Sequence, residues 1–303
     1  MISCNICCKK DFDSKWYKRW CKEFNEKPRY HRKQWEHCII VEILSERGLL
    51  KSGKKGLGFA VGEEPLPSLF AKWGVEVVAT DIDPKSKTAK LWDNGQLLKN
   101  KNKLWKNIGS KKQFNELVST RSVDMNNIPK ELLKHKFDFN WSSCSFEHLG
   151  SIQKGIKFIL KQMDSLKEGG WSIHTTELNL SSNSRTLENE NLVIYRLKDI
   201  YRMIEGLEAK NCRVEPLIIT TGTSKIEKYV DLPPYVQSPH LRLLLANFVS
   251  TSVVLIMQKQ ATNNNSFRRI YRLFEYYYNL FVLKFYYYTF LRAPLKQRLA
   301  NAK

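Results

Sequence analysis

The sequence of 303 residues has no run of about 18 uninterrupted apolar residues, the length that a membrane-spanning helix needs. It is also poor in acidic residues, because 30 Asp and Glu stand against 50 Lys and Arg, which gives a formal net charge of +20. We recognise no N-terminal signal peptide and no internal repeat. These features predict a chain without membrane spans and with an anionic partner: nucleic acid, anionic lipid or a phosphorylated substrate.

Cysteine occurs seven times, but not in the two pairs that are typical of a structural zinc site. The segment "CNICC" groups Cys4, Cys7 and Cys8, and no second pair follows at the spacing of a zinc finger. The site would need ligands from further along the chain, namely Cys21, His31 or His37. We therefore expect no zinc there, and free thiols are typical of a reducing, cytoplasmic compartment.

The middle of the chain alternates between strand-like and helix-like segments. Strands are expected at 55–62, 75–83, 136–145, 171–178, 212–220 and 248–259. Helices are expected between them, at 35–50, 65–74, 150–170 and 189–211. This alternation predicts an α/β fold with a doubly wound, mainly parallel sheet that is covered on both faces.

The composition divides the chain into three parts. Residues 1–34 are polar, basic and rich in Trp and Tyr without a clear period, so we expect an irregular extension. Residues 35–260 hold the alternating pattern of the main domain. Residues 261–303 contain a linker, "ATNNNS", and a basic, aromatic segment with helical spacing.

A glycine-containing turn follows the first expected strand of the core. Gly58 and Gly62 flank three small or apolar residues, but the spacing is not the G-x-G-x-x-G of dinucleotide sites. Glu63 and Glu64 come next, where helix N–H groups would otherwise attract a phosphate. Two interpretations stay open for these glutamates. They border a pocket for a cationic ligand, or they are the acidic first turn of a helix that begins at Pro65.

Two further acids follow strand-like segments. Asp81 ends the second strand, about twenty residues after the turn, where a carboxylate can accept both hydroxyls of a ribose. Asp124, in "RSVDMNNIP", is placed to accept the amino group of an adenine. A nucleoside without phosphate and with a cationic amino-acid tail fits these acids better than NAD does. S-adenosylmethionine is such a ligand.

Four blocks occur in one order: "GLGFAVGEEPLPSLFAKWGVEVVATDIDP", "VDMNNIP", "FDFNWSSCSFEHLGS" and "LKEGGWSIHTTELNLSSN". Together they resemble class I S-adenosylmethionine-dependent methyltransferases over about residues 35–259, and in particular a bacterial branch associated with surface-polysaccharide biosynthesis. The resemblance implies a Rossmann-like, seven-stranded sheet whose reversed last strand is 248–259. It also implies a set of cofactor-binding residues: Gly58, Ala60, Gly62, Glu64, Asp81, Ile82, Asp124, Met125 and Ser143. Ala60 replaces the usual middle glycine of that turn, and Gly56 stands where many members have an acid.

Histidines and glutamates follow the fourth and fifth strands of this pattern. Methyl transfer to an oxygen requires removal of the hydroxyl proton, and a neutral histidine is the natural base near pH 7. We predict His148 as the base and His174 as the second candidate, with Glu147 or Glu177 orienting one of them. A structural role for either histidine stays open. His148, His174 and Glu177 would also suit a two-histidine, one-carboxylate metal site, but the spacing does not require one, and we predict no metal.

Two other segments carry weaker signals. "DLPPY" (231–235) is similar to a motif of nucleobase methyltransferases, but the additional Leu232 and its place after the fifth strand favour a rigid loop near the substrate. The aromatic, basic segment from Phe267 is typical either of a helix in a membrane interface or of a helix that packs on the domain or a second subunit. Nucleic acid is not an expected partner, because no reader motif accompanies the basic residues.

These observations predict a cytoplasmic methyltransferase, peripheral at the inner face of the membrane through its tail. Its expected acceptor is a sugar hydroxyl of a surface glycan or of a lipid-linked or nucleotide-linked precursor. Two alternatives remain. One is a methyltransferase for RNA or a small molecule, which the charge of +20 supports. The other is a non-catalytic adaptor that keeps the fold and recruits glycosyltransferases through the tail.

Overall fold

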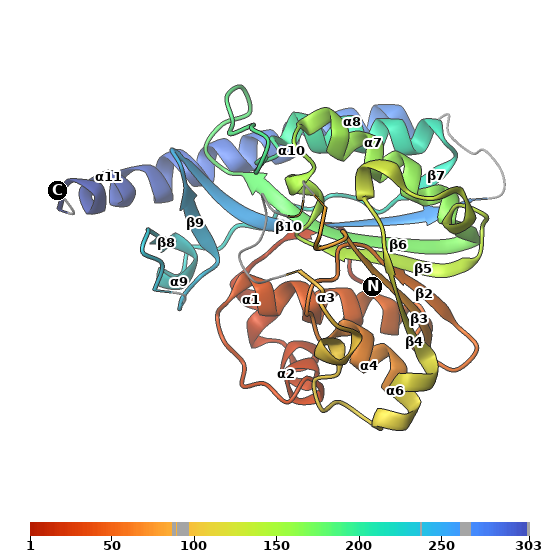
Figure 1. The fold of residues 1–303 in the computed structure, drawn as a ribbon. Helices are drawn as coiled ribbons and strands as arrows, with labels where there is room; N and C mark the ends of the chain where they lie inside the picture. The colour runs from red at the N-terminus through yellow and green to blue at the C-terminus, as the bar shows by residue number, and fades with distance from the viewer. Residues whose placement is uncertain (87–88, 90–96, 237, 261–267, 302–303) are drawn as a thin grey trace.

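In the computed structural model, residues 1–86, 89, 97–236, 238–260 and 268–301 are described. Their strands form one sheet in the order β4-β3-β2-β5-β6-β10-β9-β8, with β1 and β7 also paired to β10 (Figure 1). The strands are β1 (Asn5–Ile6), β2 (Lys55–Gly58), β3 (Glu76–Asp81), β4 (Val118–Ser122), β5 (Phe137–Ser143), β6 (Leu166–Asn179), β7 (Cys212–Val214), β8 (Val230–Asp231), β9 (Arg242–Leu245) and β10 (Phe248–Lys259).

The strand directions confirm the predicted doubly wound sheet with a reversed last strand. Neighbouring strands from β4 to β6 pair in parallel, whereas β10 runs antiparallel to β6, with Leu255 opposite His174. Within the described residues the sheet has ten strands, more than the expected seven, because the short strands β1, β8 and β9 extend it around β10.

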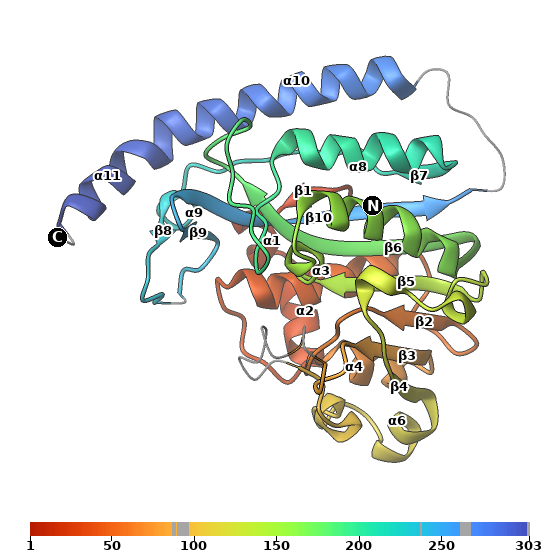
Figure 2. The ribbon, with the colours of Figure 1, turned by 45° about the horizontal axis from the view of Figure 1, so that its top comes forward.

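Helices cover both faces of this sheet (Figure 1). One face carries α1 (Lys9–Asp13), α2 (Lys15–Glu23), α3 (Arg32–Glu46), α4 (Leu66–Lys72) and α6 (Lys111–Leu117). The other face carries α7 (Ile152–Gln162) and α8 (Leu197–Ala209). Figure 2 shows α10 (Arg268–Tyr286) as an outer layer along α8, and the chain continues through a π-helical turn (Tyr287–Leu291) into α11 (Arg292–Asn301). The short α9 (Lys225–Lys228) precedes β8.

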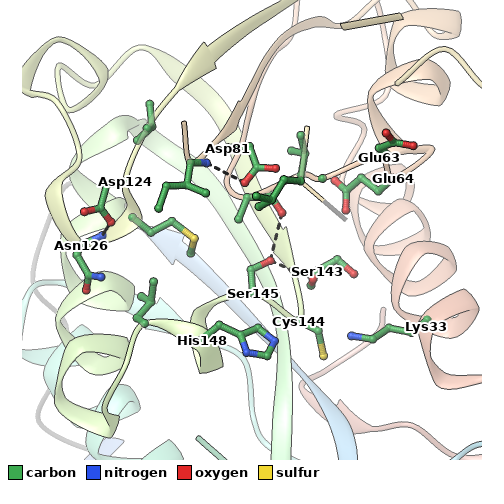
Figure 3. Close-up of a pocket in the computed structure, with 18 of the residues that line it drawn as sticks. Lys33, Glu63, Glu64, Asp81, Asp124, Asn126, Ser143, Cys144, Ser145 and His148 are labelled. Atoms are coloured by element: carbon green, nitrogen blue, oxygen red, sulfur yellow. Dashed lines mark hydrogen bonds between the residues drawn. The ribbon is translucent and has the colours of Figure 1, made fainter. Parts of the chain in front are cut away.

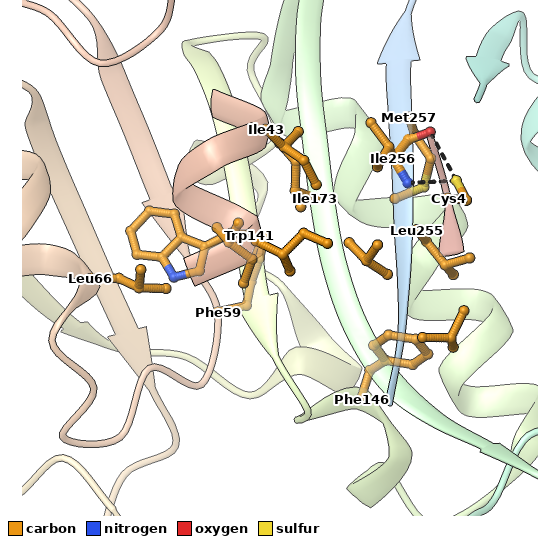
Figure 4. Packing of buried hydrophobic residues seen from close by; sticks show 14 of the residues in the cluster. Cys4, Ile43, Phe59, Leu66, Trp141, Phe146, Ile173, Leu255, Ile256 and Met257 are labelled. Atoms are coloured by element: carbon orange, nitrogen blue, oxygen red, sulfur yellow. Dashed lines mark hydrogen bonds between the residues drawn. The ribbon is translucent and has the colours of Figure 1, made fainter. Parts of the chain in front are cut away.

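The core extends across the sheet, as Figure 4 shows around Trp141 and Ile173. Trp141 of β5 fills the space beside Gly58, where a Cβ atom would lie 2.5 Å from the indole Cζ2. Such a distance leaves no room for a side chain, so glycine is required at position 58 by packing against the neighbouring strand.

The expectation that residues 1–34 are irregular is wrong. They form β1, α1, α2 and the first turn of α3, so the expected boundary at 34/35 falls inside a helix. Cys4 is fully buried, and its sulfur accepts a hydrogen bond from Ile256 N at 3.2 Å (Figure 4). Trp20 Nε1 donates to Glu42 at 2.6 Å, which joins α2 to α3. The Trp and Tyr residues lacked a clear period because they pack between short helices.

Other elements differ from the prediction at their ends. Gly169 and Gly170, expected to end a helix, lie within β6. Helix α8 begins at Leu197 rather than 189, because Tyr195 N donates to Glu177 O at 2.9 Å and keeps the preceding chain extended. The expected linker at 261–266 lies outside the described residues. Among the residues that the structure describes, no helix is both long and apolar enough to cross a bilayer.

Candidate active site

A cavity of about 490 Å³ opens at the carboxyl ends of β2, β3 and β5 (Figure 3). This is the edge where α/β sheets bind ligands. Its lining residues come from α3, the turn after β2, and the segments that follow β3, β4 and β5: Lys33, His37, Ala60, Val61, Gly62, Glu63, Glu64, Asp81, Ile82, Leu97, Val123, Asp124, Met125, Asn126, Ser143, Cys144, Ser145, His148 and Leu149.

The turn after β2 forms one wall of the cavity. Ala60 and Gly62 line it, and both have a left-handed backbone, with φ of 46° and 51°. This conformation costs an alanine about 1–2 kcal/mol, which is one reason why glycine is usual at such a position. Val61 N donates to Thr80 O at 3.0 Å, which ties the turn to β3. Gly58, which the resemblance also implied, is not among the lining residues; it packs under the turn against Trp141.

Asp81 lies where the sequence predicted, at the end of β3 and in the cavity wall. Its two carboxylate oxygens each accept one backbone hydrogen bond at 2.8 Å, from Ile82 N and Leu98 N. Burial raises the pKa of Asp81. The backbone N–H of Gly62 also bonds this carboxylate and lowers its pKa. Because the two oxygens offer about four acceptor positions, the carboxylate is held in position and can still accept a hydroxyl group of a ligand.

The wall opposite the turn comes from the segment after β4. Asp124 precedes a short 3₁₀ helix (Met125–Asn127) and accepts a hydrogen bond from Asn126 N at 2.8 Å. Met125 and Val123 are buried apolar residues beside it. Together with Asp124 and Asn126 they line the cavity. An apolar slot with an acid at its edge suits a purine ring that has an exocyclic amino group. Ile82 and Ser143, which the resemblance also implied, line the cavity too.

Glu63 and Glu64 both line the cavity, and α4 begins only after them, at Leu66. They are therefore not its first turn. Trp141 Nε1 donates to Glu64 Oε1 at 2.6 Å, and the other carboxylate oxygen lies 4.0 Å from His37 Nε2. Burial raises the pKa of Glu64 to about 8. A cation in the cavity would favour the charged form of this buried carboxyl.

The raised pKa predicts a pH dependence of stability. Glu64 has an ordinary value of 4.5 and about 8 in the folded chain. The folded state therefore binds the proton more tightly, and the free energy of unfolding should fall as the pH rises through this window. Glu64→Gln keeps an acceptor for Trp141 and removes the titration. Urea unfolding at about pH 5 and about pH 8.5 measures the effect. The free energy of unfolding of the variant, relative to that of the wild type, should be higher at pH 8.5 than at pH 5 by roughly 1–4 kcal/mol. An equal difference at both values would contradict the assignment.

His148 lies at the far end of the cavity, after β5 in a 3₁₀ turn (Phe146–His148). Its Nδ1 lies 2.8 Å from Asn191 O. Because a carbonyl only accepts, Nδ1 carries the hydrogen, and the neutral ring has its lone pair on Nε2. Figure 3 shows the ring and the Lys33 amine pointing toward one another with Cys144 between them.

Cys144 and Lys33 complete this end of the cavity. Cys144 has a left-handed backbone, with φ of 46°, directly after β5, and burial raises the pKa of its thiol well above the ordinary value. Burial lowers the pKa of Lys33, but the Glu36 carboxylate, 3.4 Å from its amine, outweighs this, so the pKa lies above its ordinary value. Lys33 therefore carries a positive charge at neutral pH.

A buried polar network lies behind this end. Glu36 is fully buried and accepts hydrogen bonds from Ser143 at 3.1 Å and from the Cys144 thiol at 3.2 Å. Arg32 forms ion pairs with Glu36 and with Glu177. Burial raises the pKa of Glu36, but Lys33 and Arg32 overcome this and lower the value to about 2. The network is charged and holds the end of β5 against α3.

The predicted catalytic glutamates belong to this network and not to the cavity wall. Glu147 is buried, and its carboxylate accepts a hydrogen bond from Thr176 at 3.0 Å. Burial raises its pKa. Glu177 accepts a hydrogen bond from Ser250 and pairs with Arg32. Neither is among the lining residues, so both are placed to position neighbours of His148 rather than to touch a ligand in the cavity.

The expected place of His174 beside His148 is wrong. His174 is fully buried, its Nδ1 lies 2.7 Å from Ser142 Oγ, and its ring packs edge-on against Phe146 and Phe158 of α7. Burial lowers its pKa to about 3, so the ring is neutral. The proposed set of His148, His174 and Glu177 is therefore not brought together. The described residues contain one other cluster with metal-ligand spacing, Cys144, Glu147 and Glu177, and its neighbour Arg32 already supplies the positive charge.

The cysteines near the N-terminus and the segment "DLPPY" have structural roles. Cys8 donates to Asp11 at 3.3 Å, and the sulfurs of Cys21 and Cys38 lie 3.8 Å apart. Within the described residues, no metal-ligand cluster forms around these cysteines. "DLPPY" begins at β8, where Asp231 Oδ2 lies 2.6 Å from His240 Nδ1. None of the residues 231–235 lines the cavity.

The sequence prediction missed the contribution of α3. Lys33 and His37 line the cavity, and Arg32 and Glu36 lie behind it, although the helix precedes the first core strand. A signal was present: charged residues interrupt an otherwise apolar helix within one turn of its start. Cys144 was missed because a thiol after a strand has no distinctive pattern.

No family model matches the sequence, and no curated protein is significantly similar to it. A structure of a SAM dependent methyltransferase from Aquifex aeolicus matches 71% of this chain and 88% of its own, with 16% identity and a TM-score of 0.39. An S-adenosylmethionine-dependent methyltransferase from Clostridium acetobutylicum matches 74% of this chain and 91% of its own, with 13% identity and a TM-score of 0.43.

A third structure is phosphoethanolamine N-methyltransferase 2 of Haemonchus contortus in complex with S-adenosyl-L-methionine. It matches 73% of this chain at 15% identity and a TM-score of 0.44, and this chain spans about half of it, 52%. The likeness to S-adenosylmethionine-dependent methyltransferases is thus one of low identity. The fold class itself rests on the strand order and on the reversed β10 described above.

Proposed function

We propose that the cavity binds S-adenosylmethionine and that the chain is a methyltransferase. The observation that carries the proposal is the charge of the cavity wall. Among the described residues, four carboxyl groups line it, from Glu63, Glu64, Asp81 and Asp124, against one lysine, Lys33. The ionised members of this set repel the pyrophosphate of a dinucleotide. A ligand with an ammonium and a sulfonium group is favoured, because its positive charge also favours the charged form of Glu64, whose pKa is about 8.

Each part of this ligand has a fitting group in the wall. Asp81 offers a carboxylate to the ribose hydroxyls, and Asp124 with Met125 offers an acid and an apolar surface to the adenine. Glu64, whose side chain is largely buried next to the turn, is suited to the cationic amino-acid part. When bound, S-adenosylmethionine supplies an electrophilic methyl group. His148 then holds the Nε2 lone pair that accepts the acceptor's proton, and its hydrogen bond to Asn191 O orients the ring.

Asp81→Asn is the substitution that tests this assignment. One amide oxygen remains for a backbone N–H, but the group loses its charge and half of its acceptors. Cofactor affinity, measured by calorimetry with S-adenosylmethionine, should weaken by about 1–3 kcal/mol, the usual worth of hydrogen bonds to a charged group. Asp83→Asn, an exposed acid two residues on that does not line the cavity, serves as control. Equal affinity in Asp81→Asn and wild type would remove the ribose assignment.

For the acceptor, we propose a sugar hydroxyl of a surface glycan or of its precursor. The support is the sequence resemblance together with a histidine base at the methyl end, since a sugar hydroxyl must lose its proton on transfer. The test supplies methyl-labelled cofactor with a glycan-precursor fraction and, separately, with total RNA. Label in the glycan fraction alone supports the proposal, whereas label in RNA alone favours the alternative acceptor.

A further inference from the structure

The outer side of α10 and of the π-helical turn presents a continuous apolar surface, which we call the aromatic face. Its nine side chains are each between 53% and 73% exposed. They are Ile270, Tyr271, Leu273, Phe274, Tyr277, Tyr278, Phe281, Phe285 and Tyr288. At 100° per residue they occupy less than half of the helix circumference. An apolar surface of this size on a soluble domain marks an interaction site.

The opposite side of α10 already packs on the domain. Leu283 and Tyr286 are buried there, and Asn279 is fully buried between α10 and the chain after β7. Arg272 lies 3.0 Å from Glu208 of α8. In Figure 2, no helix or strand of the described residues lies over the outer side of α10 and α11. The aromatic face is therefore not needed to hold the helix in place.

The charges near the C-terminal part of the aromatic face have one sign. Lys284, Arg292 and Lys296 are exposed and follow one another at helical spacing of eight and four residues. From 268 to 301 the sequence contains one acid, Glu275, and this residue is buried in an ion pair on the opposite side. The exposed Glu205 of α8 lines a groove with Ile270, Leu273 and Tyr277, at the N-terminal end of the face and away from the three cations. The C-terminal part of the face, with Tyr, Phe and these cations, complements an anionic, half-apolar partner.

We propose that the aromatic face binds the surface of an anionic lipid membrane. Phe and Leu side chains would enter the boundary between headgroups and acyl chains, Tyr hydroxyls would stay among the headgroups, and the three cations would meet the lipid phosphates. A second copy of the chain fits less well, because residues 268–301 of one copy offer no exposed acid to pair the cations of the other. This inference does not depend on the cofactor or on the acceptor.

Vesicle co-sedimentation of the full chain tests the proposal. The protein should bind vesicles of phosphatidylcholine mixed with phosphatidylglycerol, and high salt should weaken the binding. Pure phosphatidylcholine vesicles should bind it at least about tenfold less. Replacing three aromatic side chains, Phe274→Ser, Phe281→Ser and Phe285→Ser, should weaken binding to the anionic vesicles by at least about tenfold.

A matched pair of charge variants isolates the electrostatic part. Lys284→Glu, Arg292→Glu and Lys296→Glu together should reduce binding at least about tenfold. The control makes the same charge change on exposed lysines elsewhere, Lys112→Glu, Lys130→Glu and Lys134→Glu, and should keep most of the binding. Equal binding by both triple variants would overturn the proposal. The proposal would also be overturned if the wild-type chain did not bind vesicles but formed a dimer, and if the triple Phe→Ser variant were monomeric. An unchanged urea-unfolding midpoint in every variant shows that the fold is intact and keeps this test separate from the proposed cofactor and activity.

Discussion

Replacement of His148 by alanine is expected to lower the rate of methyl transfer by about 10²–10⁴-fold, the usual contribution of a positioned base. The ring lines the end of the cavity, and its hydrogen bond to Asn191 O leaves the lone pair on Nε2. Because the adenosine part is assigned to the other end of the cavity, affinity for S-adenosylmethionine should change little. Single-turnover transfer of labelled methyl to the glycan-precursor fraction measures the rate, and calorimetry measures the affinity.

Two further variants separate the base from its structural contact. His148→Gln can still donate to Asn191 O but has no basic nitrogen, so it should be as slow as the alanine variant. His135→Ala removes an exposed histidine near the start of β5, outside the cavity lining, and should retain the wild-type rate. Recovery of activity in the glutamine variant would show that His148 only positions the chain, which contradicts its assignment as base.

Replacement of Glu36 by alanine is expected to lower the free energy of unfolding by about 3–5 kcal/mol, because it leaves buried cationic and polar groups unpaired. Glu36 accepts hydrogen bonds from Ser143 and Ser252 and pairs with Arg32, all within the buried network behind the cavity. Urea unfolding at neutral pH measures the loss. Glu46→Gln, at the exposed end of the same helix, keeps an acceptor for Ile2 N and should change stability by less than about 0.5 kcal/mol.

The sign of the pH dependence gives a second readout for Glu36. Its pKa is about 2 in the folded chain and has an ordinary value of 4.5. The stabilisation is therefore fully present above about pH 4.5 and is lost as the pH falls toward 2. The Glu36→Ala variant should approach the wild type in stability in that range. A constant difference between the two down to the acid transition would contradict an ionised Glu36.

The strands that could be predicted best are those with continuous β-branched runs. "FVSTSVVLIMQK" predicts β10 with its observed ends, Phe248–Lys259, because both faces of this central strand are buried. The edge strand β4 was not predicted, since four of its five residues are exposed and polar. The pairing of β1 with β10 joins residues about 250 positions apart, as between Asn5 and Val254, and local pattern carries no information on such a contact.

The candidate site could be predicted where it follows strand ends. Asp81 and Asp124 line the cavity as expected, because acids directly after parallel strands meet at one edge of the sheet. The predicted position of His174 was wrong for a reason that the sequence already contained. It lies three residues from Glu177 on one strand, so the two side chains point to opposite faces. His174 therefore faces α7, while Glu177 faces α3. The part of the site from α3 required the tertiary packing itself.

The central claim is that the acidic cavity binds S-adenosylmethionine and does not bind a dinucleotide. Titration calorimetry of the full chain with S-adenosylmethionine, its demethylated product and NAD tests it most directly. The four carboxyl groups in the wall predict saturable, one-to-one binding of the first two ligands, no measurable heat with NAD, and weaker binding in Asp81→Asn. Binding of NAD with equal or higher affinity, or no binding of S-adenosylmethionine by a folded chain, would contradict the account.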